Sequence, residues 1–200
     1  MKSREGTVVD ADDLIADMYN TAKETSLELG KIDNLSQEEQ DALFKMISLG
    51  ALKYFILKVD PKKTMLFDPR ESIDFNGNTG PFIQYTHARI CSILRKAEET
   101  GITTENYTNA SLLDEEVELI KTLTEYPAAV RSAAQQFAPS VIAAYAYELA
   151  KQFNGYYHDH SILKEQDATT RSLRLMLAEQ VARVIRSAMS LLGIAVPERM

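Results

Sequence analysis

Apolar residues with helical spacing run through most of this chain, and no other sequence feature constrains its fold as strongly. In residues 167–192, apolar side chains recur at intervals of 4, 4, 3, 4 and 3, which places on one helix face Leu173, Leu177, Val181, Val184, Ala188 and Leu191. Glycine and proline, the usual interruptions of helices, number only 8 and 6 among the 200 residues. The sequence therefore predicts an all-α protein built as a helical bundle.

The same spacing predicts further helices with recognisable ends. The first begins after Asp10 and ends near residue 29. The second follows Ser36, which forms a capping box with Glu39, and ends before Pro61. These two helices are expected to pair as a helical hairpin. Beyond them, we expect one helix from Pro81 to Gly101 and others over 110–125, 127–137, 139–156 and 167–192.

Residues 61–80 differ from the rest because glycine, proline and asparagine gather there. Such punctuation predicts an irregular loop, with one or two short strands at Met65–Phe67 and Ile73–Phe75. This segment is also the best position for a domain boundary. We therefore divide the chain into residues 1–66 and residues 67–200.

Charge limits the partners that the chain can bind. The net charge is −7, whereas residues 151–200 alone carry 7 basic and 5 acidic side chains. Any contact with RNA is therefore expected to be local and directed at unstacked bases, not at a duplex or at DNA. One cysteine permits no internal disulfide, which favours a reducing, cytoplasmic setting. No apolar run approaches the roughly 20 residues of a membrane span, so no membrane contact is expected.

An aromatic and basic face is predicted on the helix that follows Pro81. Phe82, Tyr85 and Arg89 project together, roughly opposite the apolar stripe of that helix. Aromatic rings stack on unpaired bases, and a guanidinium binds base edges or phosphate, so this face could hold single-stranded nucleic acid. The same pattern also fits two rings that pack against the next helix and an arginine that pairs with a carboxylate. The residues alone leave both alternatives open.

Other polar residues carry less information. His158 and His160 are too isolated to predict a metal site, because only Asp159 stands nearby as a further ligand. Arg174 lies at the edge of the apolar stripe of the last helix, so it is expected to be a buried or half-buried, structural ion-pair partner. The other arginines of that helix, which include Arg183 and Arg186, are expected on a solvated face.

Three stretches resemble the arginyl-tRNA synthetases, a family of class I enzymes. DPRESIDFNGNTGPFIQYTHARI at 68–90 is similar to the start of their DALR-type anticodon-binding domain. LAKQFNGYYHDHSIL at 149–163 and the segment 171–200, which closes with LLGIAVPERM, are similar to its end. MKSREGTVVDADDLI at 1–15 resembles their KMSKS-like loop and the helix after it, so the chain is expected to begin partway through this ATP-binding signature.

The resemblance implies that the chain is the C-terminal part of a synthetase that joins arginine to tRNA with ATP and magnesium. Residues 1–66 would be the tail of the catalytic region and residues 67–200 the anticodon-binding domain. No HIGH-type signature or phosphate-binding glycine loop is present, so no catalytic residue is expected in these 200 residues, and neither a cofactor nor turnover by them alone. The implied partners are tRNA(Arg) and a catalytic domain of the same protein, in a monomer.

In this family, positions that match Phe82 and Arg89 contact the anticodon loop, a tyrosine at or near Tyr157 lines the anticodon pocket, and the terminal Met200 packs back into it. Together with the helix face described above, the predicted tRNA site is Phe82, Tyr85, Arg89, Tyr157 and Met200. The remnant of the ATP-binding loop would be Met1, Lys2, Ser3 and Arg4. Two alternatives are a free-standing tRNA-binding or regulatory module that reuses this domain, and a helical protein–protein scaffold without a role in RNA binding.

Overall fold

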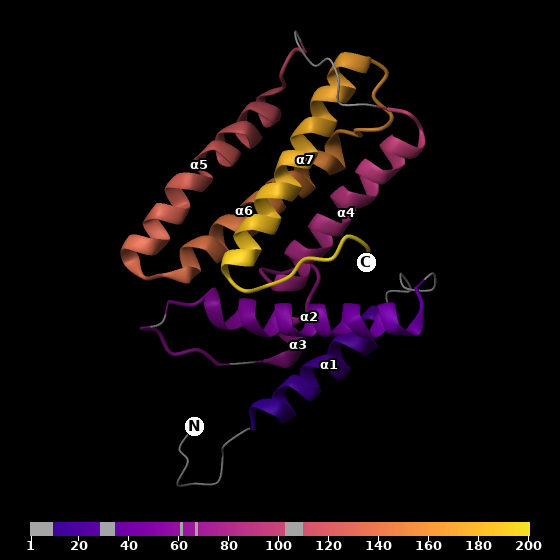
Figure 1. The fold of residues 1–200 in the computed structure, drawn as a ribbon. Coiled ribbons are helices and arrows are strands. Elements are labelled where there is room, and N and C mark those ends of the chain that lie inside the picture. Colours follow the sequence, from indigo (N-terminus) through magenta and orange to yellow (C-terminus); the bar gives the residue numbers. More distant parts are fainter. Residues whose placement is uncertain (1–9, 29–34, 61, 67, 103–109) are drawn as a thin grey trace.

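Helices account for all the regular secondary structure that is described. The computed structural model describes residues 10–28, 35–60, 62–66, 68–102 and 110–200. Within these ranges there is no strand, which confirms the predicted all-α class. The helices, labelled in Figure 1, are α1 (Ala11–Glu28), α2 (Gln37–Leu57), α3 (Pro69–Ser72), α4 (Gly80–Glu99), α5 (Asp114–Gln136), α6 (Pro139–Asp159) and α7 (Ala168–Leu191).

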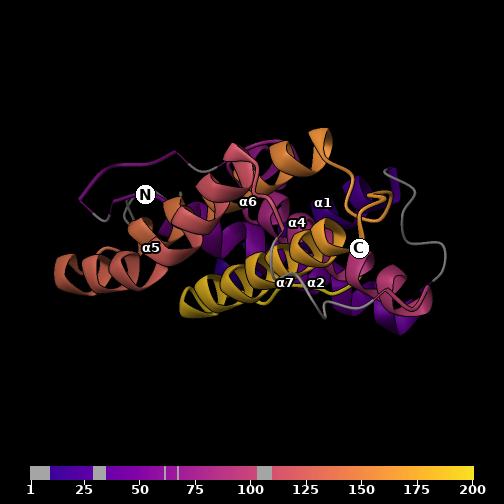
Figure 2. The ribbon, with the colours of Figure 1, turned by 90° about the horizontal axis from the view of Figure 1, so that it is seen from above.

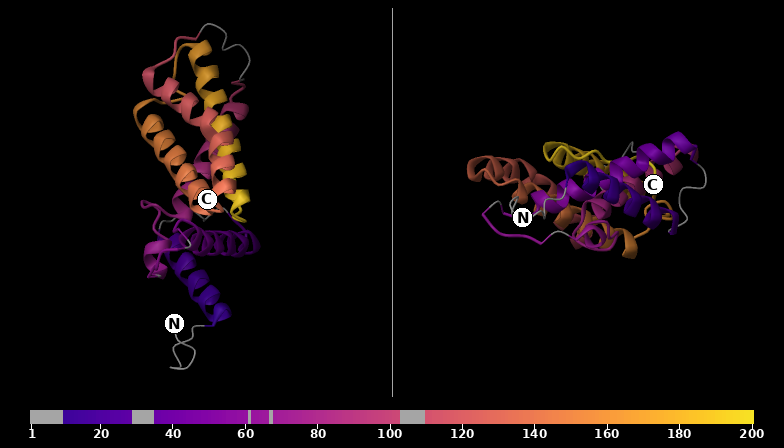
Figure 3. Two further views of the ribbon diagram at one scale, coloured as in Figure 1. Left: turned by 90° about the vertical axis from the view of Figure 1, so that its left-hand side faces the viewer. Right: turned by 90° about the horizontal axis from the view of Figure 1, so that it is seen from below.

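The helices form a bundle of α4, α5, α6 and α7 that stands on the α1–α2 hairpin. Figure 3 shows α2 lying across one end of this bundle, with α1 beyond it. Figure 2 shows the bundle from above, where α6 and α7 pack against one another. The larger core lies inside the bundle, and a smaller one lies between α1 and α2 around Met18, Phe44 and Ile47. Of the helices that these residues form, none is long and apolar enough to cross a membrane.

The predicted start of α2 is confirmed. The Glu39 amide donates to the Ser36 hydroxyl at 3.3 Å, and the Ser36 amide donates to the Glu39 carboxylate at 2.8 Å. This reciprocal pair satisfies two amides that a helix start would otherwise leave unbonded. The predicted hairpin is also present, because α1 packs along α2.

The predicted short strands are wrong where the structure describes them. Met65 and Leu66 belong to no element, Phe67 lies outside the described residues, and in the segment Ile73–Phe75 there is a turn at Ile73 and a bend at Phe75. The short helix α3 precedes that turn. Its first two free amides are bonded by the Asp68 carboxylate, and Pro69 occupies its first turn. Ile73 is only 1% exposed, because it closes the core between α1 and α2. Among the described residues no strand lies beside it.

The prediction of separate helices over 110–125 and 127–137 is also wrong. One helix, α5, continues through Pro127. Proline removes a hydrogen bond from a helix interior and usually ends or bends it. Here packing against α6 holds the two halves together: Tyr126, the residue before the proline, stacks on Tyr145 with ring centroids 5.3 Å apart. Tertiary contacts thus outweigh the local signal.

Arg174 has the predicted structural role. Its side chain in α7 is 9% exposed, and it pairs with Glu116 and Glu165, each at 3.0 Å. Glu116 is fully buried at the start of α5, where it also accepts a hydrogen bond from Tyr156 at 2.8 Å. The pair therefore ties α5, α6 and α7 together inside the core.

Candidate functional site

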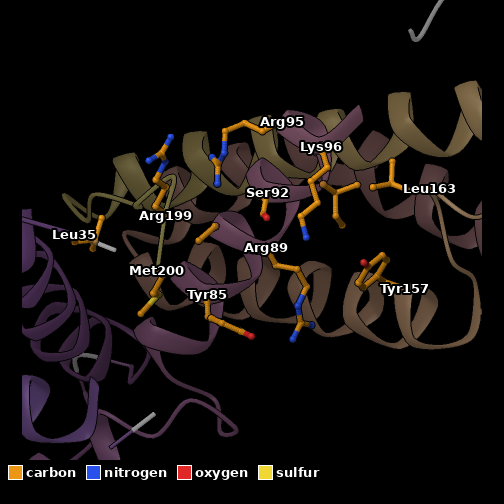
Figure 4. A pocket seen from close by; sticks show the side chains of 12 residues that line it. Leu35, Tyr85, Arg89, Ser92, Arg95, Lys96, Tyr157, Leu163, Arg199 and Met200 are labelled. Atoms are coloured by element: carbon orange, nitrogen blue, oxygen red, sulfur yellow. The ribbon is translucent and has the colours of Figure 1, made fainter. Parts of the chain in front are cut away.

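Four of the five predicted tRNA-binding residues meet in one hollow of about 490 Å³. We call it the α4 hollow, because one face of α4 forms its floor (Figure 4). Tyr85, Arg89, Tyr157 and Met200 all line it. The complete lining is Leu35, Tyr85, Ala88, Arg89, Ser92, Ile93, Arg95, Lys96, Tyr157, Leu163, Arg199 and Met200.

The lining is positively charged although the chain as a whole is acidic. Four of the lining residues are cationic, namely Arg89, Arg95, Lys96 and Arg199, and none is an aspartate or glutamate. The net charge of the whole sequence is −7. The lining therefore has a local positive charge that suits an anion. Three of its four cations belong to α4, and only Arg199 comes from residues 151–200, where the sequence showed a local excess of basic side chains.

Arg89 is held at the centre of the lining, between Tyr85 and Tyr157 (Figure 4). Tyr85 and Arg89 are four residues apart and so share one face of α4. The guanidinium carbon lies 4.7 Å from the centroid of the Tyr85 ring, a cation–π contact. The Arg89 Nη1 donates to the Asn154 amide oxygen of α6. Within the described residues Arg89 has no carboxylate partner, so its charge remains available to a ligand.

Tyr157 projects into the hollow from the last part of α6, and its neighbour Tyr156 projects into the core. The Tyr157 ring stacks on the fully buried Phe153 at 6.1 Å with an angle of 5° between the planes. Tyr156 is 4% exposed and bonds Glu116. Burial, followed by that hydrogen bond, raises the pKa of the Tyr156 phenol. The two adjacent tyrosines thus divide between the hollow and the core.

Phe82 does not line the α4 hollow. It packs against Tyr147 of α6, with ring centroids 5.4 Å apart, and contributes to the bundle core. Residues three apart on a helix point in directions about 60° apart, which is enough to turn Phe82 towards α6 while Tyr85 faces outward. For this residue, packing against the next helix, the alternative that the sequence left open, matches the observed contacts.

The C-terminal segment reaches the hollow because two buried polar residues of α4 hold its backbone. Gln84 is fully buried, and its amide nitrogen donates to the carbonyls of Met46 at 3.1 Å and Ala195 at 2.8 Å. His87 is 1% exposed, and its Nδ1 donates to the Pro197 carbonyl at 2.8 Å. Burial lowers the pKa of His87, so the ring is neutral with its proton on the nitrogen that faces the carbonyl.

Sequence reasoning missed this role of Gln84 and His87. Both stand in the stretch QYTH that the resemblance highlighted, but their partners lie 111 and 110 residues away. The only available signal was two polar side chains, three positions apart, beside the apolar face of a helix. Such a pattern is compatible with two buried side chains that hydrogen-bond another segment, but it does not identify that segment.

The end of the chain is fixed at further points. Arg95 donates to the Glu198 carbonyl at 3.0 Å, and Arg186 pairs with the Glu198 carboxylate at 2.9 Å. Met200 packs against the small core between α1 and α2, as does Leu35. The α1–α2 hairpin therefore borders the hollow, which spans both segments of the predicted division at residues 66 and 67.

The remaining candidates lie elsewhere. His158 is exposed, and His160 packs beside Tyr156 with ring centroids 5.2 Å apart. Within the ranges that the structure describes, no group of three or more histidine, cysteine, aspartate or glutamate side chains could hold a metal ion. Met1, Lys2, Ser3 and Arg4 lie outside the described residues.

Comparison with known proteins gives consistent matches. The DALR anticodon binding domain matches residues 83–200. The arginine–tRNA ligase of Bacteroides fragilis is 56% identical over 202 residues, and that of Flavobacterium psychrophilum is 54% identical over 200 residues. Each match includes 100% of this chain but only 34% and 33% of the relative, so the chain spans about a third of the length of these relatives. The matching part is their C-terminal part.

Two solved structures have the same fold. The arginyl-tRNA synthetase of Thermus thermophilus superposes with a TM-score of 0.85 and 32% sequence identity. That match covers 96% of this chain and 32% of the other chain. The arginyl-tRNA synthetase of Plasmodium falciparum gives a TM-score of 0.80 at 25% identity, with 96% and 34% covered.

Proposed function

The chain belongs to the family of DALR anticodon binding domains, and on this premise we propose that its α4 hollow binds the anticodon loop of a tRNA. The observation that supports this proposal is the meeting of Tyr85, Arg89, Tyr157 and Met200 in one cationic hollow. These residues come from two helices and from the end of the chain.

The chemistry of the lining suits unstacked nucleotides. Tyr85 and Tyr157 present aromatic surface on either side of Arg89, and a base that stacks on such a ring gains about 1–3 kcal/mol. Arg89 can donate to a base edge or to a phosphate, while Arg95, Lys96 and Arg199 supply further positive charge. A duplex would need a wider basic surface than this hollow offers.

The tRNA is tRNA(Arg), and the protein that includes this chain joins arginine to it with ATP and magnesium. The support is that the relatives are named arginine–tRNA ligases and that the chain matches their C-terminal third. In this proposal residues 67–200 read the anticodon, and residues 1–66 connect them to a catalytic domain of the same protein. In this proposal the role of the chain is to bind the tRNA.

The test is binding of the chain to the anticodon stem-loop of tRNA(Arg), measured by fluorescence anisotropy. Arg89→Ala and Tyr157→Ala are each expected to weaken binding by about tenfold, which corresponds to the loss of one stacking or charge-assisted contact. Arg183→Ala is the matched control, because Arg183 lies on the exposed face of α7 in a pair with Glu179 and does not line the hollow. Unchanged affinity in both hollow variants would refute the proposal.

Phe82 provides a sharper test within the same assay. Phe82→Leu keeps an apolar side chain against Tyr147 but removes the aromatic ring. If Phe82 stacks on a base, this variant binds the stem-loop as weakly as Tyr157→Ala. If Phe82 only packs against α6, the affinity stays close to that of the unmodified chain.

A further inference from the structure

Behind Arg89, a chain of hydrogen bonds joins α4 to α6. The Thr86 hydroxyl donates to the Phe82 carbonyl one turn earlier, at 2.9 Å. The Asn154 amide nitrogen donates to the Thr86 hydroxyl oxygen at 2.7 Å. The Asn154 amide oxygen then accepts from Arg89 Nη1. None of these bonds involves a predicted tRNA-binding residue other than Arg89 and the backbone of Phe82.

The direction of every bond in this chain is determined. A hydroxyl has one hydrogen to donate, and Thr86 uses its hydrogen on the Phe82 carbonyl, which can only accept. Towards Asn154 the hydroxyl must therefore accept. This turns the amide nitrogen of Asn154 to Thr86 and its oxygen to Arg89, which can only donate. Thr86 is fully buried, so water does not compete for these bonds.

A neutral amide has a further consequence for Arg89. A carboxylate in the place of Asn154 would also hold the guanidinium but would offset its charge. Asn154 fixes the side chain and leaves the charge intact. Tyr85, which lies on α4 like Arg89, also restricts the Arg89 side chain, because the centroid of its ring is 4.7 Å from the guanidinium carbon.

We propose that Thr86 and Asn154 are positioning residues that hold the Arg89 guanidinium in place for an RNA phosphate or base edge. This inference rests on the proposed function of the α4 hollow. Arginine has many rotamers, and a side chain that is already held loses less conformational freedom when a ligand binds. Thr86 and Asn154 thus act on the ligand only through Arg89.

The experiment is a double-mutant cycle on binding of the tRNA(Arg) anticodon stem-loop to the chain. Thr86→Val removes the hydroxyl with little change in shape and is expected to weaken binding about fivefold, the value of one hydrogen bond. Thr86→Ser keeps the hydroxyl and is expected to restore affinity. In the Arg89→Ala background, Thr86→Val is expected to have no further effect on affinity. Thr122→Val is the matched control, because Thr122 makes the same hydroxyl-to-carbonyl bond, at 3.1 Å, in α5 and outside the hollow.

A second arm uses Asn154 and does not depend on the stability of the Thr86 variant. Asn154→Asp adds a carboxylate beside Arg89 and is expected to weaken binding and to reduce its dependence on salt. A loss for Thr86→Val that is equally large with Arg89 and without it would overturn the positioning role, and so would Asn154→Asp with the affinity of the unmodified chain. If Arg89→Ala itself leaves binding unchanged, the proposed function of the hollow fails instead.

Discussion

At the scale of residues, the polar side chains inside the bundle differ in how far the sequence determines them. Arg174 was predicted to be an ion-pair partner from its angle on the last helix, and the pair is present. Its main partner could not be predicted in the same way. Glu116 belongs to the acidic first turn of α5, where a glutamate is ordinarily exposed and favoured by the helix dipole, and it is fully buried only because α6 and α7 cover it.

Removal of Arg174 is expected to be costly. Arg174→Met leaves the Glu116 carboxylate buried without its cation, which should lower the free energy of unfolding by about 3–5 kcal/mol. Arg183→Met on the same helix breaks an exposed pair with Glu179 and should change it by less than about 1 kcal/mol. Urea unfolding followed by circular dichroism measures both values. Equal losses for the two variants would contradict the structural role of Arg174.

His87 should make the stability of the protein depend on pH. Burial lowers its pKa in the folded state below the ordinary value near 6.5, so the unfolded chain binds the proton more readily. The resulting loss of stability is absent above the ordinary pKa near 6.5 and grows as the pH falls through that value. His87→Asn keeps an N–H donor for the Pro197 carbonyl but does not titrate. Between about pH 7.5 and 5.5, the melting temperature should fall more for the unmodified chain than for His87→Asn, and parallel curves would contradict this.

At the scale of elements, local patterns predicted where most helices start and end, and contacts between helices decided the exceptions. The starts of α2 and α6 follow a capping box and a proline, signals that lie within a few residues of the helix. Pro127 gave the opposite result, because packing against α6 keeps α5 continuous. A sequence shows the local cost of such a proline but not the packing that offsets it.

The crossing of α2 and α4 depends on two glycines that face each other. A Cβ at Gly80 would lie 2.6 Å from the Gly50 carbonyl oxygen, so Gly80→Ala must push the helices apart. We expect it to lower the free energy of unfolding by about 1–3 kcal/mol. Gly155→Ala in α6 meets nothing within 4 Å and should raise it by about 0.5–1 kcal/mol. Chemical denaturation distinguishes the two, and a loss for both variants would show that the close approach is not the cause.

At the scale of the whole molecule, the α4 hollow exists because distant segments meet. Tyr85 and Arg89 could be placed on one face from their spacing alone, whereas Tyr157 and Met200 required a resemblance to a known family. Leu35 was not predicted at all, although it lines the hollow from the α1–α2 hairpin. The bonds that bring Ala195 and Pro197 to α4 span more than a hundred residues, and helical periodicity carries no information about contacts at that range.

The uneven charge of the molecule leads to a prediction about salt. Four cationic side chains line the hollow, while the chain as a whole carries −7, so RNA should be attracted at the hollow and repelled elsewhere. For a single-stranded loop, each neutralised phosphate contributes about −0.7 to the slope of log K against log salt, so the slope for the anticodon stem-loop should lie between about −1 and −3. Lys96→Gln should make it shallower by about 0.7, and Lys121→Gln, in a pair with Glu118 on α5, should not change it. A titration of binding against sodium chloride gives the slope. A value steeper than about −3 would require basic surface beyond the four side chains, and a value of zero would mean that the hollow does not contact phosphate.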